Sequence, residues 1–224
     1  MPIDIYTIKE PPSAACATFI WMHGLGASGE DMSHLVTALQ IDALPIRHIF
    51  LNAPIQPVTI NGGMRMPAWY DILGDQLIDR EDERGILATE AGLREVISHE
   101  LAKGISSRAI YLAGFSQGGA MALHTGLRYP EPLGGIVVLS AYLPLIYTVN
   151  QHFPDQNLST PVFLAIGTED PIIPCEWTRA SITLLIKKGC TRLEWCTYPM
   201  MHSTCAEELK DLNAWISKQV KTQL

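Results

Sequence analysis

Six short apolar runs alternate with helical patterns, and this alternation constrains the fold more than any other feature of the chain. The runs lie at residues 18–22, 48–52, 109–113, 135–139, 162–166 and 193–198. Most of them lack polar–apolar alternation, which is typical of strands buried on both faces of a parallel sheet. Helical patterns lie at residues 31–39, 83–103, 117–129, 176–187 and 204–220. This order predicts an α/β fold: a mostly parallel, doubly wound sheet with helices on both faces.

Two local patterns indicate a long loop and the start of the last helix. The longest stretch without a regular pattern is residues 53–82, and long loops in compact domains are often functional lids. At the start of the last helix, Thr204 and Glu207 have the spacing of a capping box.

Composition and charge exclude several classes of protein. The chain has 224 residues, 47% of them hydrophobic, and we expect a single domain over residues 1–224. The net charge is −7 without a basic patch, so a nucleic-acid partner is not expected. The apolar run at residues 14–22 falls far short of the ~20 residues of a membrane helix. No basic signal-peptide start is visible, and a stable membrane anchor is therefore not expected.

Cysteine usage points to a reducing compartment. The number of cysteines is odd, and no two have C-x-x-C spacing, so neither a disulfide framework nor a zinc site follows. We expect reduced cysteines, no bound metal and a cytoplasmic location. The residues concerned are Cys16, Cys175, Cys190, Cys196 and Cys205.

The strongest chemical signal is the sequence GFSQG at residues 114–118. It follows the apolar run 109–113 and precedes a helical pattern, which is the context of a nucleophile elbow. Such a turn would hold Ser116 in strained backbone geometry with its hydroxyl exposed. The alternative interpretation is a glycine-rich structural turn.

A serine hydroxyl needs a base, and the elbow requires the chain order Ser, then Asp or Glu, then His. Three histidines follow Ser116. His124 lies inside the next helix and His152 in a polar connector, whereas His202 lies in a loop between an apolar run and the last helix. We therefore predict His202 as the base.

The acid is expected after the run at residues 162–166. Glu169 and Asp170 are both candidates there, and Asp170 is favoured because it precedes Pro171 and suits a tight extended loop. Its role would be to orient the imidazole and stabilise the imidazolium.

An oxyanion hole needs two backbone N–H donors at the reacting carbonyl. Gln117, directly after the nucleophile, is predicted to supply one. The loop His23-Gly24-Leu25-Gly26 directly follows the first apolar run and would supply the other through Leu25.

Five segments in this order resemble the phospholipase/carboxylesterase family of α/β-hydrolases, which includes carboxylesterases and acyl-protein thioesterases, and most closely its bacterial carboxylesterase branch. They are HGLGASGED, NAPIQPVTINGGMRMPAWYDI, GFSQGG, GTEDPIIP and YPMMHS. The resemblance implies an α/β-hydrolase fold with a minimal cap. It also implies a catalytic triad of Ser116, Asp170 and His202, with Leu25 and Gln117 as oxyanion donors.

The resemblance further implies that residues 60–73 border the acyl site. Met201 stands where many members of the family have glycine, so its side chain would narrow or line the pocket. We expect an adaptable apolar surface. An inward-packed, structural role stays equally open for Trp69 and Tyr70. The residues expected to bind substrate are Met64, Met66, Trp69, Tyr70 and Met201.

The predicted function is a cofactor-free serine hydrolase that cleaves esters or thioesters of short-to-medium acyl chains through an acyl-enzyme. Its partners would be small-molecule esters, thioesters or lysolipids. Two alternatives are an acyltransferase and a catalytically silent α/β-hydrolase that binds a ligand. The oligomeric state is open, with a homodimer among the options.

Overall fold

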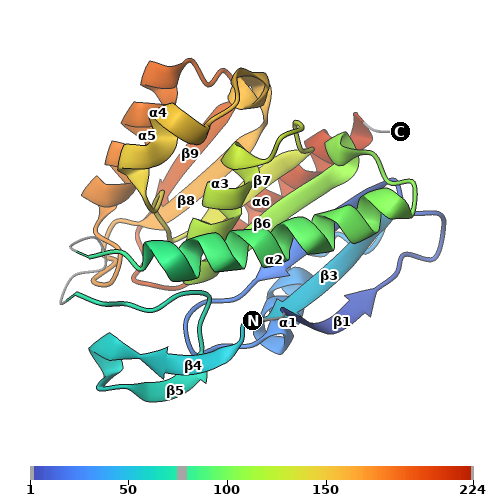
Figure 1. The fold of residues 1–224 in the computed structure, drawn as a ribbon. Coiled ribbons are helices and arrows are strands. Elements are labelled where there is room, and N and C mark those ends of the chain that lie inside the picture. Colours follow the sequence, from blue (N-terminus) through green and yellow to red (C-terminus); the bar gives the residue numbers. More distant parts are fainter. Residues whose placement is uncertain (1–2, 75–79, 223–224) are drawn as a thin grey trace.

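The computed structural model describes residues 3–74 and 80–222, and its centre is a seven-stranded sheet (Figure 1). Among the described residues of this sheet, all neighbouring strands pair in parallel except β1 and β3, which are antiparallel. The prediction of a mostly parallel sheet is therefore confirmed. In spatial order the strands are β1 (Asp4–Lys9), β3 (Ile46–Asn52), β2 (Ala17–Met22), β6 (Ile110–Phe115), β7 (Gly135–Leu139), β8 (Val162–Gly167) and β9 (Leu193–Tyr198).

Helices cover both faces of the sheet, as the alternation predicts. One face carries α2 (Glu83–Ala102), α3 (Gln117–Arg128) and α5 (Cys175–Lys188), and the other carries α1 (Gly29–Ala38) and α6 (Ala206–Lys221) (Figure 1). A short α4 (Val149–His152) lies after β7. No helix in the described residues is long and apolar enough to cross a membrane.

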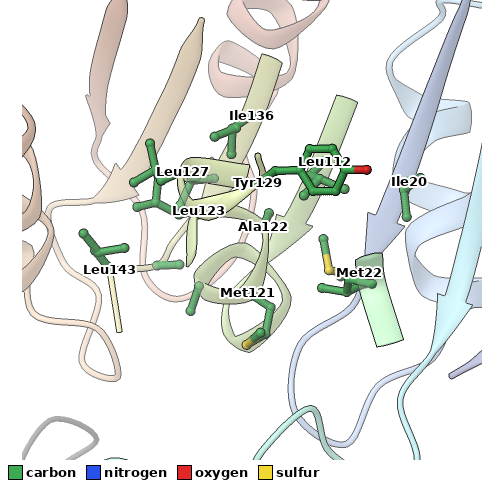
Figure 2. Packing of buried hydrophobic residues seen from close by; sticks show 14 of the residues in the cluster. Ile20, Met22, Leu112, Met121, Ala122, Leu123, Leu127, Tyr129, Ile136 and Leu143 are labelled. Carbon is green, nitrogen blue, oxygen red and sulfur yellow. The ribbon is translucent and has the colours of Figure 1, made fainter. Parts of the chain in front are cut away.

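The central strands have no polar side because each separates two apolar cores. In β2, Ile20 and Met22 pack under α2 and α3, whereas Phe19 and Trp21 pack toward α1 and α6. Figure 2 shows Ile20 and Met22 beside Leu112 of β6 and the side chains of α3. All of these side chains are buried, so the start of α3 is held by a closely packed interior.

The long stretch after β3 has more structure than its sequence pattern predicts. Strands β4 (Ile55–Val58) and β5 (Met64–Pro67) form an antiparallel hairpin, with a 3₁₀ turn at Thr59–Asn61 between them. Gly62 and Gly63 have φ angles of 65° and 79°, which glycine adopts without a steric penalty. Part of the expected lid, residues 75–79, lies outside the described residues.

The predicted capping box at Thr204 is wrong. Helix α6 begins at Ala206 after the N-cap residue Cys205, and no side chain caps it. The third helical position is therefore Glu208, and this side chain is fully buried.

Candidate active site

Ser116 lies in a strained turn between β6 and α3. Its φ and ψ angles are 53° and −123°, a region that residues with a Cβ rarely occupy. The Ser116 N–H donates to the carbonyl oxygen of Leu139 at 2.8 Å, which fixes the turn on the neighbouring strand. A Cβ on Gly114 would overlap the backbone of Gly118, and one on Gly118 would overlap the backbone of Met22. The glycines of the motif are therefore required by close backbone contacts.

His202 joins Ser116 to Asp170. The Nε2 atom of His202 lies 2.9 Å from the Ser116 hydroxyl, and its Nδ1 atom lies 2.7 Å from Oδ2 of Asp170. An ionised carboxylate only accepts hydrogen bonds, so the proton of a neutral imidazole lies on Nδ1. Nε2 is then free to accept the serine proton.

The loop after β8 fixes the Asp170 carboxylate from behind. Its Oδ1 atom accepts hydrogen bonds from the N–H groups of Ile172 and Ile173 at 2.8 and 2.9 Å. The Asp170 side chain is fully buried, whereas Glu169 is exposed. The two adjacent carboxylates thus differ in environment, and only Asp170 contacts the imidazole.

The two predicted oxyanion donors lie beside Ser116. Gln117 is the first residue of α3, so its N–H has no acceptor inside the helix. In the described residues, neither this N–H nor that of Leu25 donates to a backbone carbonyl. The loop that carries Leu25 runs close to the serine, since a Cβ on Gly24 would lie 3.3 Å from the Ser116 Cβ. The positive end of the α3 dipole lies at the same place.

A buried histidine supports this loop. The Nε2 atom of His23 accepts from the Ala53 N–H at 3.0 Å, so the ring proton lies on Nδ1 and points to the Gly24 carbonyl, 2.6 Å away. Burial lowers the pKa of His23, which keeps the imidazole neutral. With both ring nitrogens bonded to backbone groups, His23 shapes its loop rather than transfers protons.

The Gln117 side chain ties the segment after the hairpin to the elbow, a role that the GFSQG motif alone does not predict. Its Oε1 atom accepts from the Trp69 N–H and its Nε2 atom donates to the Tyr70 carbonyl, both at 2.8 Å. The amide thus satisfies one backbone N–H and one backbone carbonyl of the segment that follows β5. The motif shows only that a glutamine follows the serine, and the partner segment is not visible in the sequence.

A mostly apolar cavity of about 710 Å³ opens at Ser116 and His202. Asp31 is the one carboxylate among its described lining residues, and neither Lys nor Arg is among them. The cavity is therefore suited to a hydrocarbon chain. Its apolar walls come from Leu25, Ala27, Met32, Leu35, Ile72, Phe115, Ala120, Ile172 and Ile173, with Tyr70 and Tyr142 beside them.

Of the five residues expected to bind substrate, the structure brings only Tyr70 to this cavity. Trp69 is 1% exposed and packs inward, because its indole N–H donates to the His23 carbonyl. Met66, like Leu25, packs against the small buried cluster of Val58, Ala68 and Ile72. Met64 and Met201 project outward and are 64% and 63% exposed. For Trp69 the inward-packed alternative therefore holds, and the expectation that Met64, Met66 and Met201 line the cavity is corrected by the positions of these side chains.

No ligand cluster for a metal ion occurs in residues 3–74 and 80–222, and the five cysteines are free thiols.

Comparison with known proteins agrees with this geometry. The sequence profile of the phospholipase/carboxylesterase family matches residues 3–220, nearly the whole chain. The chain belongs to the phospholipase/carboxylesterase family. Its sheet with helices on both faces is the α/β-hydrolase fold, and its activity is the hydrolysis of carboxylic esters and thioesters.

Relatives within the phospholipase/carboxylesterase family are similar over most of their length. The chain is 44% identical to acyl-protein thioesterase 1 of Schizosaccharomyces pombe, over 80% of each chain. It is 41% identical to acyl-protein thioesterase 1 of Gibberella zeae, over 91% of each chain. The crystal structure of Zea mays acyl-protein thioesterase 2 superposes with a TM-score of 0.85 at 28% identity, covering 96% of this chain and 98% of that one. These relatives are fungal and plant proteins, not members of the bacterial branch.

Proposed function

We propose that Ser116 is the nucleophile of this hydrolase, that His202 is its base and that Asp170 orients the imidazole. The observation that carries the proposal is the pair of hydrogen bonds from Ser116 to His202 and from His202 to Asp170, at 2.9 and 2.7 Å. Ser116 attacks the carbonyl while Nε2 of His202 takes its proton. The same nitrogen then donates that proton to the leaving alcohol or thiol, and water releases the acyl group.

The tetrahedral oxygen binds the N–H groups of Leu25 and Gln117. Both donors stay in place through the reaction, since the His23 and Gln117 side chains hold the surrounding loops. Loss of one such donor typically costs about 10²–10³ in kcat. No cofactor takes part in this scheme.

The proposed substrates are thioesters and esters of short-to-medium acyl chains, with protein S-acyl groups, lysolipids and small esters as the candidate classes. The names of the similar acyl-protein thioesterases favour a thioester, and the apolar cavity favours a hydrocarbon acyl group. Each buried CH₂ contributes about 0.8 kcal/mol, roughly fourfold in kcat/KM when fully desolvated. We expect kcat/KM to rise from acetyl to about hexanoyl by less than fourfold per methylene.

A fluorophosphonate probe tests the mechanism. It should label the wild-type protein at Ser116 and leave Ser116→Ala unlabelled, whereas a silent binding module would show no labelling at all. Matched oxygen esters and thioesters of one acyl group then give the leaving-group preference. Product analysis with added alcohol separates a hydrolase from an acyltransferase, because only the latter would transfer most acyl groups away from water.

A cytoplasmic location is part of the proposal. It rests on the five free cysteines, all of them partly buried thiols that a reducing compartment would preserve. Fractionation of the source cells tests it.

A further inference from the structure

Strand β1 forms one edge of the main sheet, and within the described residues only β3 pairs with it (Figure 1). All six residues of β1 are exposed, and three of them are apolar or aromatic: Ile5, Tyr6 and Ile8, at 48%, 43% and 36% exposure. A strand edge with free N–H and C=O groups can pair with a further strand. The exposed side chains of β1 show which strand would fit.

A β-bulge at Tyr6 sets the faces of β1. Ile5 lies opposite Leu51 of β3 and Thr7 lies opposite Phe50, so Tyr6 is an extra residue without a partner in the register. Successive residues of a regular strand point to opposite faces, and one extra residue shifts this alternation.

Because of the shift, the two charged ends of β1 lie on one face. Asp4, Thr7 and Lys9 share the face of their partners Asn52, Phe50 and His48, which alternate along β3. Ile5 and Ile8 lie on the opposite face. In a regular strand Asp4 and Lys9 would point to opposite faces, since they are an odd number of residues apart.

The five paired positions of β1 are self-complementary about Thr7. When a second β1 is placed antiparallel to the first with Thr7 opposite Thr7, and Tyr6 stays unpaired in both copies, Asp4 lies opposite Lys9 and Ile5 lies opposite Ile8. The Asp4–Lys9 and Ile5–Ile8 pairs then each occur twice and the Thr7–Thr7 pair lies on the axis, as two-fold symmetry requires. Opposite charges and apolar side chains are the favourable cross-strand pairs. We propose that this edge binds a second copy of the chain and joins the two sheets into one.

The surroundings of β1 are compatible with this pairing. Lys9 forms an ion pair with Asp42 at 2.6 Å, but both side chains are exposed, and an ammonium group has three donors. Asp4 has no ion-pair partner among the described residues. Pro11 and Pro12 follow β1 and lack the N–H that a longer ladder would need. The contact is therefore short and closes as a dimer.

The proposed interface is separate from the active site. Ser116 follows β6, and both β3 and β2 lie between β6 and β1 in the sheet. Variants at the edge should therefore keep the specific activity of each copy, which provides a check that they are folded.

Charge reversal tests the pairing. Sedimentation velocity over the micromolar range should show a wild-type dimer. Asp4→Lys places like charges opposite each other at both ends of the ladder, as does Lys9→Asp, and each should raise the dimer dissociation constant by at least about tenfold. A wild-type protein that stays monomeric throughout, or single variants that dimerise like wild type, would overturn the proposal.

Mixing the two variants gives the decisive result. The Asp4→Lys copy carries two lysines and the Lys9→Asp copy two aspartates, so a heterodimer has both ion pairs with opposite charges. An equimolar mixture should regain the wild-type dissociation constant, although each variant alone dimerises at least about tenfold more weakly. Asp42→Asn is the matched control, because it removes the partner of Lys9 within the chain and should leave the dimer intact. A mixture that stays monomeric contradicts the register.

Discussion

The indole nitrogen of Trp69 donates a hydrogen bond to the carbonyl oxygen of His23 at 2.8 Å. This bond joins the segment after the β4–β5 hairpin to the loop that carries Leu25. Gln117 holds the same segment through the Trp69 N–H, so one tryptophan connects two sides of the proposed oxyanion hole. Its ring lies beneath the site rather than in the cavity.

Trp69→Phe should therefore weaken the support of the oxyanion loop without changing acyl selectivity. Removing the donor leaves the buried His23 carbonyl unpaired, at a cost of about 1–3 kcal/mol in unfolding free energy. The melting temperature should fall, and kcat/KM should decrease by a similar factor for acetyl and hexanoyl esters. The control is Trp195→Phe, at a residue that is 37% exposed, which should change neither quantity. If Trp69→Phe lost activity only with long acyl chains, the prediction would be wrong and Trp69 would contact the acyl chain.

Ser116→Ala should lower kcat by at least ~10⁴, because triad residues act as one unit. The inactive variant should keep the far-UV circular dichroism spectrum of the wild type. Ser116→Gly should be equally inactive but melt at a higher temperature than Ser116→Ala, since glycine relieves the strain of a φ of 53°. Substantial turnover by either pure variant would exclude Ser116 as the nucleophile.

Asp170→Asn should reduce kcat by about 10⁴, as loss of the equivalent carboxylate does in other triads. An amide at this position can present an N–H to Nδ1 of His202 and so disfavour the productive tautomer. The matched variant is Glu169→Gln, one residue away and exposed, which should stay close to wild-type activity. Steady-state kinetics on one ester compares them, and the reverse ranking would refute the assignment of the acid.

Glu208→Gln should stabilise the protein at alkaline pH. Burial of this side chain raises the pKa of Glu208 to about 7 from its ordinary 4.5. Between these values the folded state keeps a proton that the unfolded state has released, so wild-type stability falls as pH rises from 4.5 to 7. Glutamine does not ionise, so the stability of the Glu208→Gln variant does not fall with pH for this reason.

The advantage of Glu208→Gln over wild type should therefore be larger at pH 8 than at pH 5, by at most about 3 kcal/mol in unfolding free energy. Urea denaturation at both values measures it. Glu207→Gln, at the exposed neighbour, should show no such pH dependence. An equal effect of Glu208→Gln at pH 5 and pH 8 would mean that this carboxyl titrates normally.

Chelation should leave the activity intact. The residues that form the proposed mechanism are a serine, a histidine and an aspartate, and no step of it uses a metal. Incubation with EDTA followed by an ester assay tests this. Loss of turnover that added metal restores would require a different mechanism.

The sequence alone predicted the elements whose signals are local. Apolar runs without alternation indicated the parallel strands, because a strand covered on both faces has no polar side. The motif around Ser116 predicted a turn in which backbones approach closely, since glycine is the residue that allows it. Chain order and Pro171 then selected His202 and Asp170, and these side chains lie within hydrogen-bond distance of each other.

Tertiary contacts decided the rest. Strand β1 was not predicted, because an exposed edge strand has neither a buried apolar run nor strict alternation. Whether Trp69 faces the cavity or the interior depends on an acceptor 46 positions earlier in the chain. The exposure of Met64 and Met201 likewise depends on segments that no local pattern connects to them. A sequence specifies periodicity, turn geometry and chemistry over a few residues, whereas the direction of a loop side chain follows from partners that only the folded chain brings near.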